Sequence, residues 1–355
     1  MRAINATVMR QVNKRLILNQ IRSRPISRAE LAEETGLTRA SVTQIVEELI
    51  SEGMVIETSI IGRTRLGRRS TQLAVNPRAG AIFAVNLGRE HCTVGVTDMR
   101  GAVLRQNTEL VPGRTPGEIL DAVADTIARQ TKALGLDEKR IFGVGVSAPG
   151  PLNPETGVLL CPVGFEMWHN LPVAQLLSQR TGLPVYLESA ADAQALEQKY
   201  FSRAGDSFAL VRVEDSLSVG VVVRGSLYRG EPGFPLDLGR CPFVDGRCLD
   251  ELVAPSILSA SAGAHSWAEY LKQDSAREQM ISDLARVLVN VIYAYRVGSI
   301  ILGGAAGELL APCIATIENT VRERLAPGTP LTIRAAQTNP VCMAAMPVYD
   351  TLFQQ

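Results

Sequence analysis

The chain has 355 residues, of which 46% are hydrophobic and 20% charged, with 36 basic and 36 acidic side chains. At roughly 100 to 200 residues per domain, this length suffices for two or three globular units with full cores. The composition excludes an intrinsically disordered chain and a small disulfide-stapled scaffold. The six cysteines are scattered without close pairs, so we expect reduced thiols.

No apolar run approaches the roughly 20 residues of a membrane-spanning helix. The first fifteen residues carry charges where a signal peptide would have an apolar stretch. We therefore expect a cytoplasmic protein with no membrane partner.

Charge is balanced only over the whole chain. Residues 1–80 contain 13 basic and 7 acidic side chains, a net charge of +6, so the remaining residues carry −6. This asymmetry predicts a basic module for a polyanion, joined to a mildly acidic body. The composition changes near Asn76 and Pro77, so we place the domain boundary there, with a module over 1–77 and a body over 78–355.

The module begins with two helices that can be read from their periodicity and caps. Apolar residues at helical spacing predict a first helix over about 6–22. Ser27, followed three residues later by Glu30, forms a capping box that predicts a short second helix running through Glu34.

A third helix is predicted over about 39–51, after a tight turn at Gly36 and a cap at Thr38. Two short helices joined by a glycine-containing turn form a helix-turn-helix. Small and amide side chains on the polar face of the third helix suit the major groove of DNA, although an ordinary solvated helix face would have the same pattern. The predicted DNA-binding residues of this unit are Arg28, Thr38, Arg39, Ala40, Ser41, Thr43 and Gln44.

Two strand-like runs follow, over 54–58 and 72–75, and a basic tip separates them. Such a wing can follow a phosphate backbone or enter a narrow minor groove; the alternative is a solvated basic loop. Together with the net charge of +6, the pattern predicts a winged helix-turn-helix that binds double-stranded DNA. Four further DNA-binding residues are predicted in the tip: Arg63, Arg65, Arg68 and Arg69.

The body alternates strand-like and helical segments in two successive sets, which predicts two α/β lobes with a ligand cleft between them. We place the first lobe at 78–190, the second at 191–340 and a C-terminal helix at 341–355. Strand-like segments occur at 82–85, 93–96, 103–104, 141–146, 184–187, 208–211, 219–223 and 299–302, with helices at 118–133 and 191–201.

Several motifs in this order and spacing resemble the ROK family of repressors, open reading frames and sugar kinases. The motifs are 28–32 and 67–69 in the module, and Gly143–Gly150, Trp168–Pro172, Leu227–Gly230 and Ile301–Gly304 in the body. The resemblance covers almost the whole chain. It implies an actin-like, ribonuclease-H-like fold for the body, behind the DNA-binding module of the family's regulators.

The resemblance also allows the kinase chemistry to be tested. In ROK kinases, an aspartate in a Glu-Asn-Asp-Ala-Asn segment accepts the proton of the sugar hydroxyl. The corresponding segment is Glu188–Asp192, in which Ala190 stands at the base position and its methyl group accepts no proton. The two phosphate loops of the kinases correspond to 86–90, which lacks their aspartate, and to 214–220, which carries two carboxylates. We predict that the protein is not an enzyme and needs no cofactor.

A structural zinc site typical of the family is also eroded. Arg240 stands where the resemblance places a histidine ligand, and an arginine ligates no metal. Cys241 and Cys248 remain, and two free thiols are favoured over a site completed by outside ligands. We predict no metal.

The same alignment indicates an effector site. The expected effector is a sugar, a sugar phosphate or a sugar acid, and an arginine there would favour an anionic ligand such as the last two. The alternative is that Asp237 and Arg240 pair with each other and that ligand binding is lost. The predicted effector-binding residues are Asn170, Glu188, Ser189, Asp237, Arg240 and Asp250.

These expectations combine into a transcriptional regulator that binds a double-stranded operator through its module. The resemblance implies a repressor of carbohydrate genes that acts as a homo-oligomer, a dimer or tetramer. Two alternatives stay open: a sugar kinase with a DNA-binding arm, and a DNA-binding protein that responds to no effector.

Overall fold

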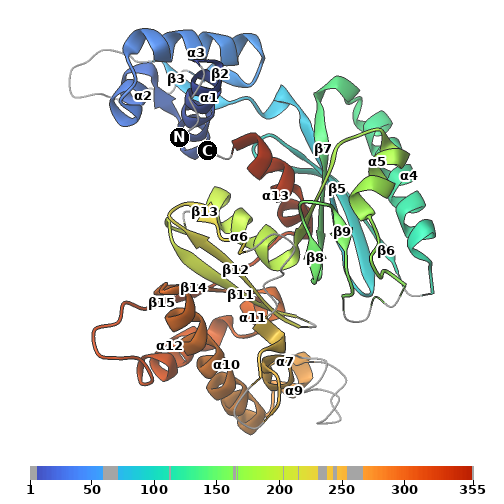
Figure 1. Cartoon of the computed structure of the whole chain (residues 1–355), viewed down its shortest axis with the longest axis vertical. Coiled ribbons are helices and arrows are strands. Elements are labelled where there is room, and N and C mark those ends of the chain that lie inside the picture. Colours follow the sequence, from blue (N-terminus) through green and yellow to red (C-terminus); the bar gives the residue numbers. More distant parts are fainter. Residues whose placement is uncertain are drawn as a thin grey trace.

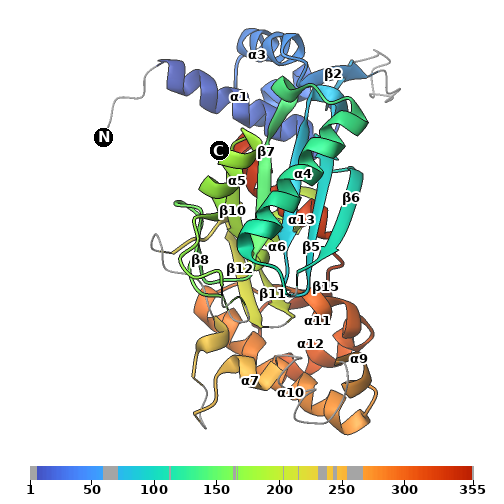
Figure 2. The same cartoon turned by 90° about the vertical axis from the view of Figure 1, so that its right-hand side faces the viewer.

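The computed structural model describes residues 6–58, 71–111, 113–162, 165, 167–202, 204–214, 216–230, 238–242, 246–253 and 267–353. An N-terminal helical module is followed by two α/β lobes (Figures 1 and 2). No described helix is both long and apolar enough to cross a membrane.

The module is a winged helix-turn-helix, as predicted. Ser27 and Glu30 form the expected capping box, and Gly36 ends the second helix with a positive φ of 70°. A two-residue strand, which the sequence did not indicate, adds to the wing strands in an antiparallel sheet of order β1-β3-β2. The elements are α1 (Ala6–Ser23), β1 (Ile26–Ser27), α2 (Arg28–Thr35), α3 (Arg39–Ser51), β2 (Val55–Thr58) and β3 (Gln72–Val75).

The first lobe is built on a five-stranded sheet of order β10-β7-β4-β5-β6. Strands β4, β5 and β6 form an antiparallel meander, and β7 and β10 run parallel to β4. The strands are β4 (Ala81–Leu87), β5 (His91–Asp98), β6 (Val103–Leu110), β7 (Ile141–Ala148) and β10 (Val185–Ser189). The remaining elements are η1 (Pro77–Ala79), α4 (Pro116–Leu134), η2 (Glu138–Arg140), β8 (Leu152–Asn153), β9 (Val158–Leu159) and α5 (Val173–Thr181).

The second lobe repeats this pattern in a sheet of order β13-β12-β11-β14-β15, again with three antiparallel strands followed by two parallel ones. Its strands are β11 (Phe208–Val213), β12 (Leu217–Val223), β13 (Ser226–Leu227), β14 (Ser299–Gly303) and β15 (Thr332–Ala335). Its other elements are η3 (Leu238–Arg240), α7 (Leu249–Val253), α9 (Trp267–Tyr270), α10 (Asp274–Tyr295), α11 (Gly304–Leu309), η4 (Ala311–Cys313) and α12 (Ile314–Arg322).

In each lobe, the helix that follows the last strand of the sheet packs on the other lobe. Helix α6 (Ala190–Phe201) follows β10 but packs on β11 and β12, and α13 (Pro340–Phe353) follows β15 but lies on β4, β5 and β7. The two helices also pack against each other (Figure 1). Gly145 makes the close approach of α13 to β7 possible, because a Cβ there would overlap the carbonyl oxygen of Ala344.

The module is joined to the first lobe through a continuous hydrophobic core. Ile17 and Ile21 of α1 belong to the same buried cluster as Tyr349 and Phe353 of α13. The connecting chain is also held, since Arg100 Nε donates to the carbonyl oxygen of Val75 at 2.9 Å.

Candidate functional site

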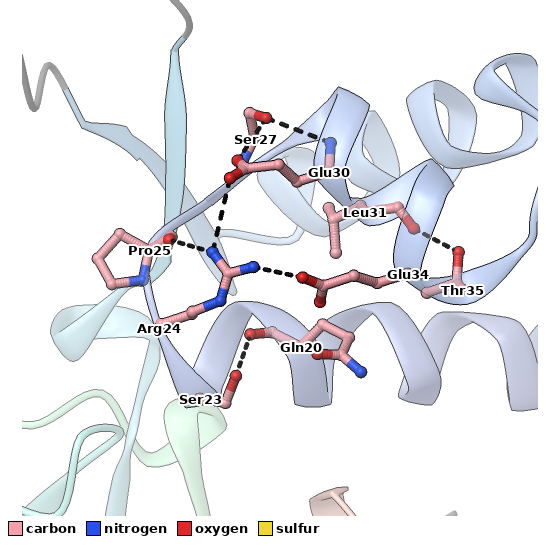
Figure 3. Close-up of polar contacts among 9 residues, drawn as sticks. All are labelled: Gln20, Ser23, Arg24, Pro25, Ser27, Glu30, Leu31, Glu34 and Thr35. Carbon is pink, nitrogen blue, oxygen red and sulfur yellow. Dashed lines mark hydrogen bonds and ion pairs between the residues drawn. The ribbon is translucent and has the colours of Figure 1, made fainter. Parts of the chain in front are cut away.

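Helix α2 is fixed to the end of α1 by polar contacts (Figure 3). Arg24, directly after α1, forms ion pairs with Glu30, at 3.7 Å, and with Glu34. Ser27 N donates to Glu30 Oε2 at 2.9 Å, which closes the capping box. These contacts set the angle between α1 and the helix-turn-helix.

Helix α3 buries one stripe and exposes the other, as predicted. Val42, Val46 and Leu49 are fully buried, whereas Arg39, Ala40 and Gln44 are exposed. The three exposed residues therefore form the accessible part of the predicted recognition face.

The hydroxyl groups of that face make local hydrogen bonds. Thr38 Oγ1 caps α3 by accepting from Ser41 N at 3.2 Å, and the two hydroxyls lie 2.9 Å apart. Thr43 Oγ1 donates to the carbonyl oxygen of Arg39 at 2.9 Å. These contacts order the first turn of α3, the turn that would approach base edges in a major groove.

Ion pairs inside the module occupy several of its charges. Glu48 of α3 accepts from Arg10 and Lys14 of α1, each at 2.8 Å. The hydrogen bond from Lys14, followed by that from Arg10, lowers the pKa of Glu48 to about 2. Arg28, predicted to contact DNA, lies 2.7 Å from Glu57 of β2.

The described part of the module carries no net charge. Residues 6–58 contain seven basic and seven acidic side chains. Four of the excess arginines of the module belong to the wing tip, and they lie outside the described residues: Arg63, Arg65, Arg68 and Arg69. Their contacts with DNA remain a prediction.

A polar cluster lies between the two lobes, which we call the interlobe cluster: Glu188, Ser189, Asp192 and Arg229. Glu188 is the second-to-last residue of β10 in the first lobe and is only 2% exposed. It lies 2.5 Å from the guanidinium of Arg229, which follows β13 in the second lobe. Burial raises the pKa of Glu188, although Arg229 acts in the opposite direction. Burial and then Glu188 raise the pKa of Asp192 to about 8.

The other predicted effector residues have varied surroundings. Asn170 is exposed and has a positive φ of 47°, and Arg240 is exposed in η3. Asp250 Oδ1 accepts a hydrogen bond of 2.6 Å from Leu217 N, so this carboxylate helps to hold the start of β12. Asp237 lies outside the described residues.

Two members of the interlobe cluster were not among the predicted site residues. Arg229 belongs to the motif Leu227–Gly230, which marked its position but not its pairing with Glu188. Asp192 is the last residue of the aligned segment Glu188–Asp192, and it pairs with Ser189 at the start of α6. The turn from β10 into α6 brings the carboxylates of Glu188 and Asp192 together. The position of this turn depends on where β10 ends.

The positions that carry kinase chemistry in the family have other interactions. Ala190 is the first residue of α6. Asn86 Oδ1 accepts from Ser147 Oγ at 2.7 Å. At the second loop, Arg212 pairs with Glu214 and donates to Oε1 of the fully buried Gln194 at 3.0 Å.

Cys241 and Cys248 are free thiols, and Leu249 N donates to the carbonyl oxygen of Cys241 at 3.0 Å. Within the described ranges, no three His, Cys, Asp or Glu residues are grouped to hold a metal ion.

Two family models match the chain. The model described as ROK family matches residues 82–339, and a model described as winged helix-turn-helix DNA-binding matches residues 10–56. The two matches correspond to the two-lobed body and to the module.

Individual proteins are also similar to this chain. The chain is 30% identical to the xylose repressor of Caldicellulosiruptor bescii, over 69% of this chain and 62% of the relative. It is 25% identical to the DNA-binding transcriptional dual regulator NagC of Escherichia coli, over 70% of this chain and 64% of that protein. This chain thus spans less than two thirds of the length of each.

One solved structure extends the likeness to both parts of the molecule. It is a ROK family transcriptional regulator, a homologue of the E. coli MLC protein. Its TM-score is 0.79 at 23% identity, and the match covers 97% of both chains. This likeness confirms the predicted arrangement of a winged helix-turn-helix before a two-lobed domain.

Proposed function

Because the chain belongs to the ROK family and carries a winged helix-turn-helix in front of the family domain, we propose that it is a DNA-binding transcriptional repressor of carbohydrate genes. The observation that carries this proposal is the exposed face of α3, with Arg39, Ala40 and Gln44 accessible on a helix whose opposite stripe is buried. A folded recognition helix needs both properties to enter a major groove.

Phosphate binding is assigned mainly to the wing. The described helix-turn-helix carries equal numbers of acidic and basic side chains, so it offers little net attraction for DNA. The arginines at 63, 65, 68 and 69 supply four positive charges within seven residues. In this proposal α3 reads base edges, and the wing holds the backbone. Two copies of the chain would place two recognition helices on a pseudo-palindromic operator.

The interlobe cluster is the proposed effector site, together with Asn170, Arg240 and the segment around Asp237. It combines a buried carboxylate, a hydroxyl and an arginine whose side chain is 38% exposed. Carboxylates and hydroxyls bind sugar hydroxyl groups, and the guanidinium suits a phosphate or carboxylate. The proposed effector is therefore a sugar, a sugar phosphate or a sugar acid.

Phosphotransfer is not proposed for this protein. Ala190 provides no base, and Asn86 replaces the metal-binding carboxylate of the family's kinases. Arg212 and Glu214 pair with each other beside Gln194, where the kinases present glycine amides to a phosphate. Each of these positions would need a different side chain before ATP chemistry could occur.

A gel-shift titration with the DNA upstream of the chain's own gene tests the regulatory proposal. Retardation at low protein concentration that weakens steeply with added salt is the expected result. Retardation that is absent at every salt concentration, with this DNA and with duplexes selected from random sequence, would sink the proposal.

Two further measurements test the assignments to the body. Incubation with ATP and a panel of hexoses and pentoses is expected to give no sugar phosphate. A thermal-shift screen against sugars, sugar phosphates and sugar acids is expected to find a ligand that raises the melting temperature, because such a ligand binds only the folded state. Sugar-dependent turnover of ATP would overturn the first assignment.

A further inference from the structure

Arg22 is one of the residues that attach the DNA-binding module to the body. Arg22, in the last turn of α1, donates from Nη1 to the carbonyl oxygen of Tyr200 at 2.6 Å. Its guanidinium carbon lies 4.5 Å from the centre of the Tyr200 ring and 5.8 Å from that of Phe353. Arg22 is partly buried at the joint, and this burial lowers the pKa of its guanidinium.

Further polar contacts hold the body's side of this joint. Tyr200 Oη donates to Asp350 Oδ1 of α13 at 2.6 Å, and Lys199 Nζ lies 3.4 Å from the same oxygen. Asn19, one turn before Arg22, donates to the carbonyl oxygen of Phe353. The end of α1 is thereby bonded to the C-terminal ends of both α6 and α13.

The opposite end of α6 lies in the interlobe cluster. Ser189 caps the helix by accepting from Asp192 N at 3.1 Å. Glu188, the residue before the cap, forms the ion pair with Arg229 that joins the two lobes. A ligand that engages Arg229 or Glu188 must change this ion pair, and hence the position of the helix start relative to the second lobe.

Helix α6 suits a mechanical connection between these ends. It has 12 residues, about 18 Å at 1.5 Å per residue, and eight of them are buried. It packs on β11 and β12 of the second lobe and on α13. A buried helix in close-packed surroundings shifts as a unit and does not absorb a displacement locally.

We propose that α6 couples the interlobe cluster to the DNA-binding module, with Arg22 as the residue that positions the module. In the state described here, the ion pair of Glu188 with Arg229 and the contact of Arg22 with Tyr200 are both formed. An effector that replaces the ion pair moves α6, and Arg22 transmits the movement to α1 and so to the recognition helix. The regulatory part of this inference rests on the proposed function.

Hydrogen exchange of the full chain tests the coupling without a ligand or DNA. The variants are Arg229→Ala at one end of α6, Arg22→Ala at the other, and the double variant. Mass spectrometry follows peptides over 185–192 and 13–23. Because coupling between two sites is reciprocal, each single variant is expected to raise exchange in both peptides, by about threefold or more at the distant one.

The effect of the double variant on exchange distinguishes coupling through α6 from two independent local defects. In the double variant, exchange is expected to rise by less than the product of the two single effects. The inference is overturned if each substitution affects only its own peptide, or if the two effects multiply. Arg224→Gln in the β12–β13 turn and Arg15→Gln on α1 replace exposed arginines of the same two regions, and both are expected to leave the distant peptide unchanged.

Conservative variants keep the test decisive if an alanine variant fails to fold. Arg22→Lys retains the charge but loses the planar stack, so it is expected to uncouple the two ends. Tyr200→Phe keeps both the ring and the carbonyl oxygen, and it is expected to retain coupling. Retained coupling in Arg22→Lys would count against the role of Arg22.

A DNA-binding measurement on the same variants then separates this inference from the proposed function. With a duplex selected by the wild-type chain, Arg229→Ala is expected to change the affinity by about threefold or more, and this effect is expected to vanish in the Arg22→Ala background. If no duplex is bound, the proposed function fails while the exchange experiment still decides the coupling. An equal effect in both backgrounds would overturn the inference alone.

Discussion

Ser189 and Asp192 hold each other at the start of α6. The Ser189 hydroxyl donates to Asp192 Oδ2 at 2.9 Å, and Asp192 N donates back to Ser189 Oγ at 3.1 Å. The other carboxyl oxygen of Asp192 is buried and has no hydrogen-bond partner among the described residues. With its pKa raised to about 8 by burial and by Glu188, this carboxyl is largely protonated at neutral pH.

We expect the free energy of unfolding to fall as the pH rises from about 4 to about 8. The native state keeps a proton on Asp192 that the unfolded state releases near pH 4, so this residue contributes a negative slope of at most about 1.4 kcal/mol per pH unit. Asp192→Asn should flatten this dependence and stabilise the protein most at pH 8. Urea unfolding between pH 5 and 8 measures it. The matched control is Asp125→Asn, on the exposed face of α4; equal slopes in wild type and Asp192→Asn would contradict the prediction.

Loss of one partner of the interlobe ion pair should be costly. Arg229→Ala leaves Glu188 buried beside Asp192 without its cation, and we expect a loss of about 3 kcal/mol, the low end for a broken buried pair because Arg229 is partly exposed. A double-mutant cycle uses Glu188→Gln, Arg229→Gln and the variant with both substitutions. The double variant should lose less stability than the sum of the two single losses. Denaturant titrations of the four proteins measure this cycle, and strict additivity would show that the pair contributes no coupling.

Gln44 should determine a base preference. A glutamine amide can pair with both edge atoms of an adenine in the major groove, and such a contact discriminates by about 1–3 kcal/mol. Gln44→Ala is therefore expected to weaken binding to a selected duplex and relax the preference at one base pair, with no change in salt dependence. Competition binding against single-base variants of the duplex tests this. Gln106→Ala, at an exposed position of β6, serves as the control.

The wing arginines, in contrast, should determine how steeply DNA affinity falls with salt concentration. Each phosphate contact contributes a slope of about −0.9 to log K against log salt concentration. Single substitutions to glutamine at Arg63, Arg65, Arg68 and Arg69 should each make the slope less negative by up to this amount. Filter binding over a series of salt concentrations gives the slope. Arg105→Gln, an exposed arginine of β6, should leave it unchanged.

Local signals predicted the module well. The helix predicted over 39–51 agrees with α3, because Thr38 caps its start and its apolar stripe has a clear helical period. The helix at Ser27 likewise begins at its capping box. In contrast, β1 has only two residues, which is too short for a periodic pattern. It is a strand because it pairs with β3, so the sequence did not predict it.

Long-range contacts were beyond the reach of the sequence patterns. A terminal helix was predicted, but its place on the first lobe depends on glycines at 95 and 145 in strands far along the chain. Arg22 and Tyr200 are separated by 178 positions, and nothing in either segment indicates the other. Of the predicted effector residues, Glu188 pairs with Arg229 and Ser189 with Asp192 in the interlobe cluster, and Asp250 accepts from the backbone of Leu217.

The hydrophobic cluster that includes Ile17, Ile21 and Phe353 has a consequence for protein engineering. A chimera that exchanges the first 76 residues for those of another regulator would place foreign side chains against α13. Such a hybrid should fold and respond only if the inner face of its first helix is transplanted to match the recipient. Under the proposed function, the DNA-binding module and the body therefore could not be exchanged independently.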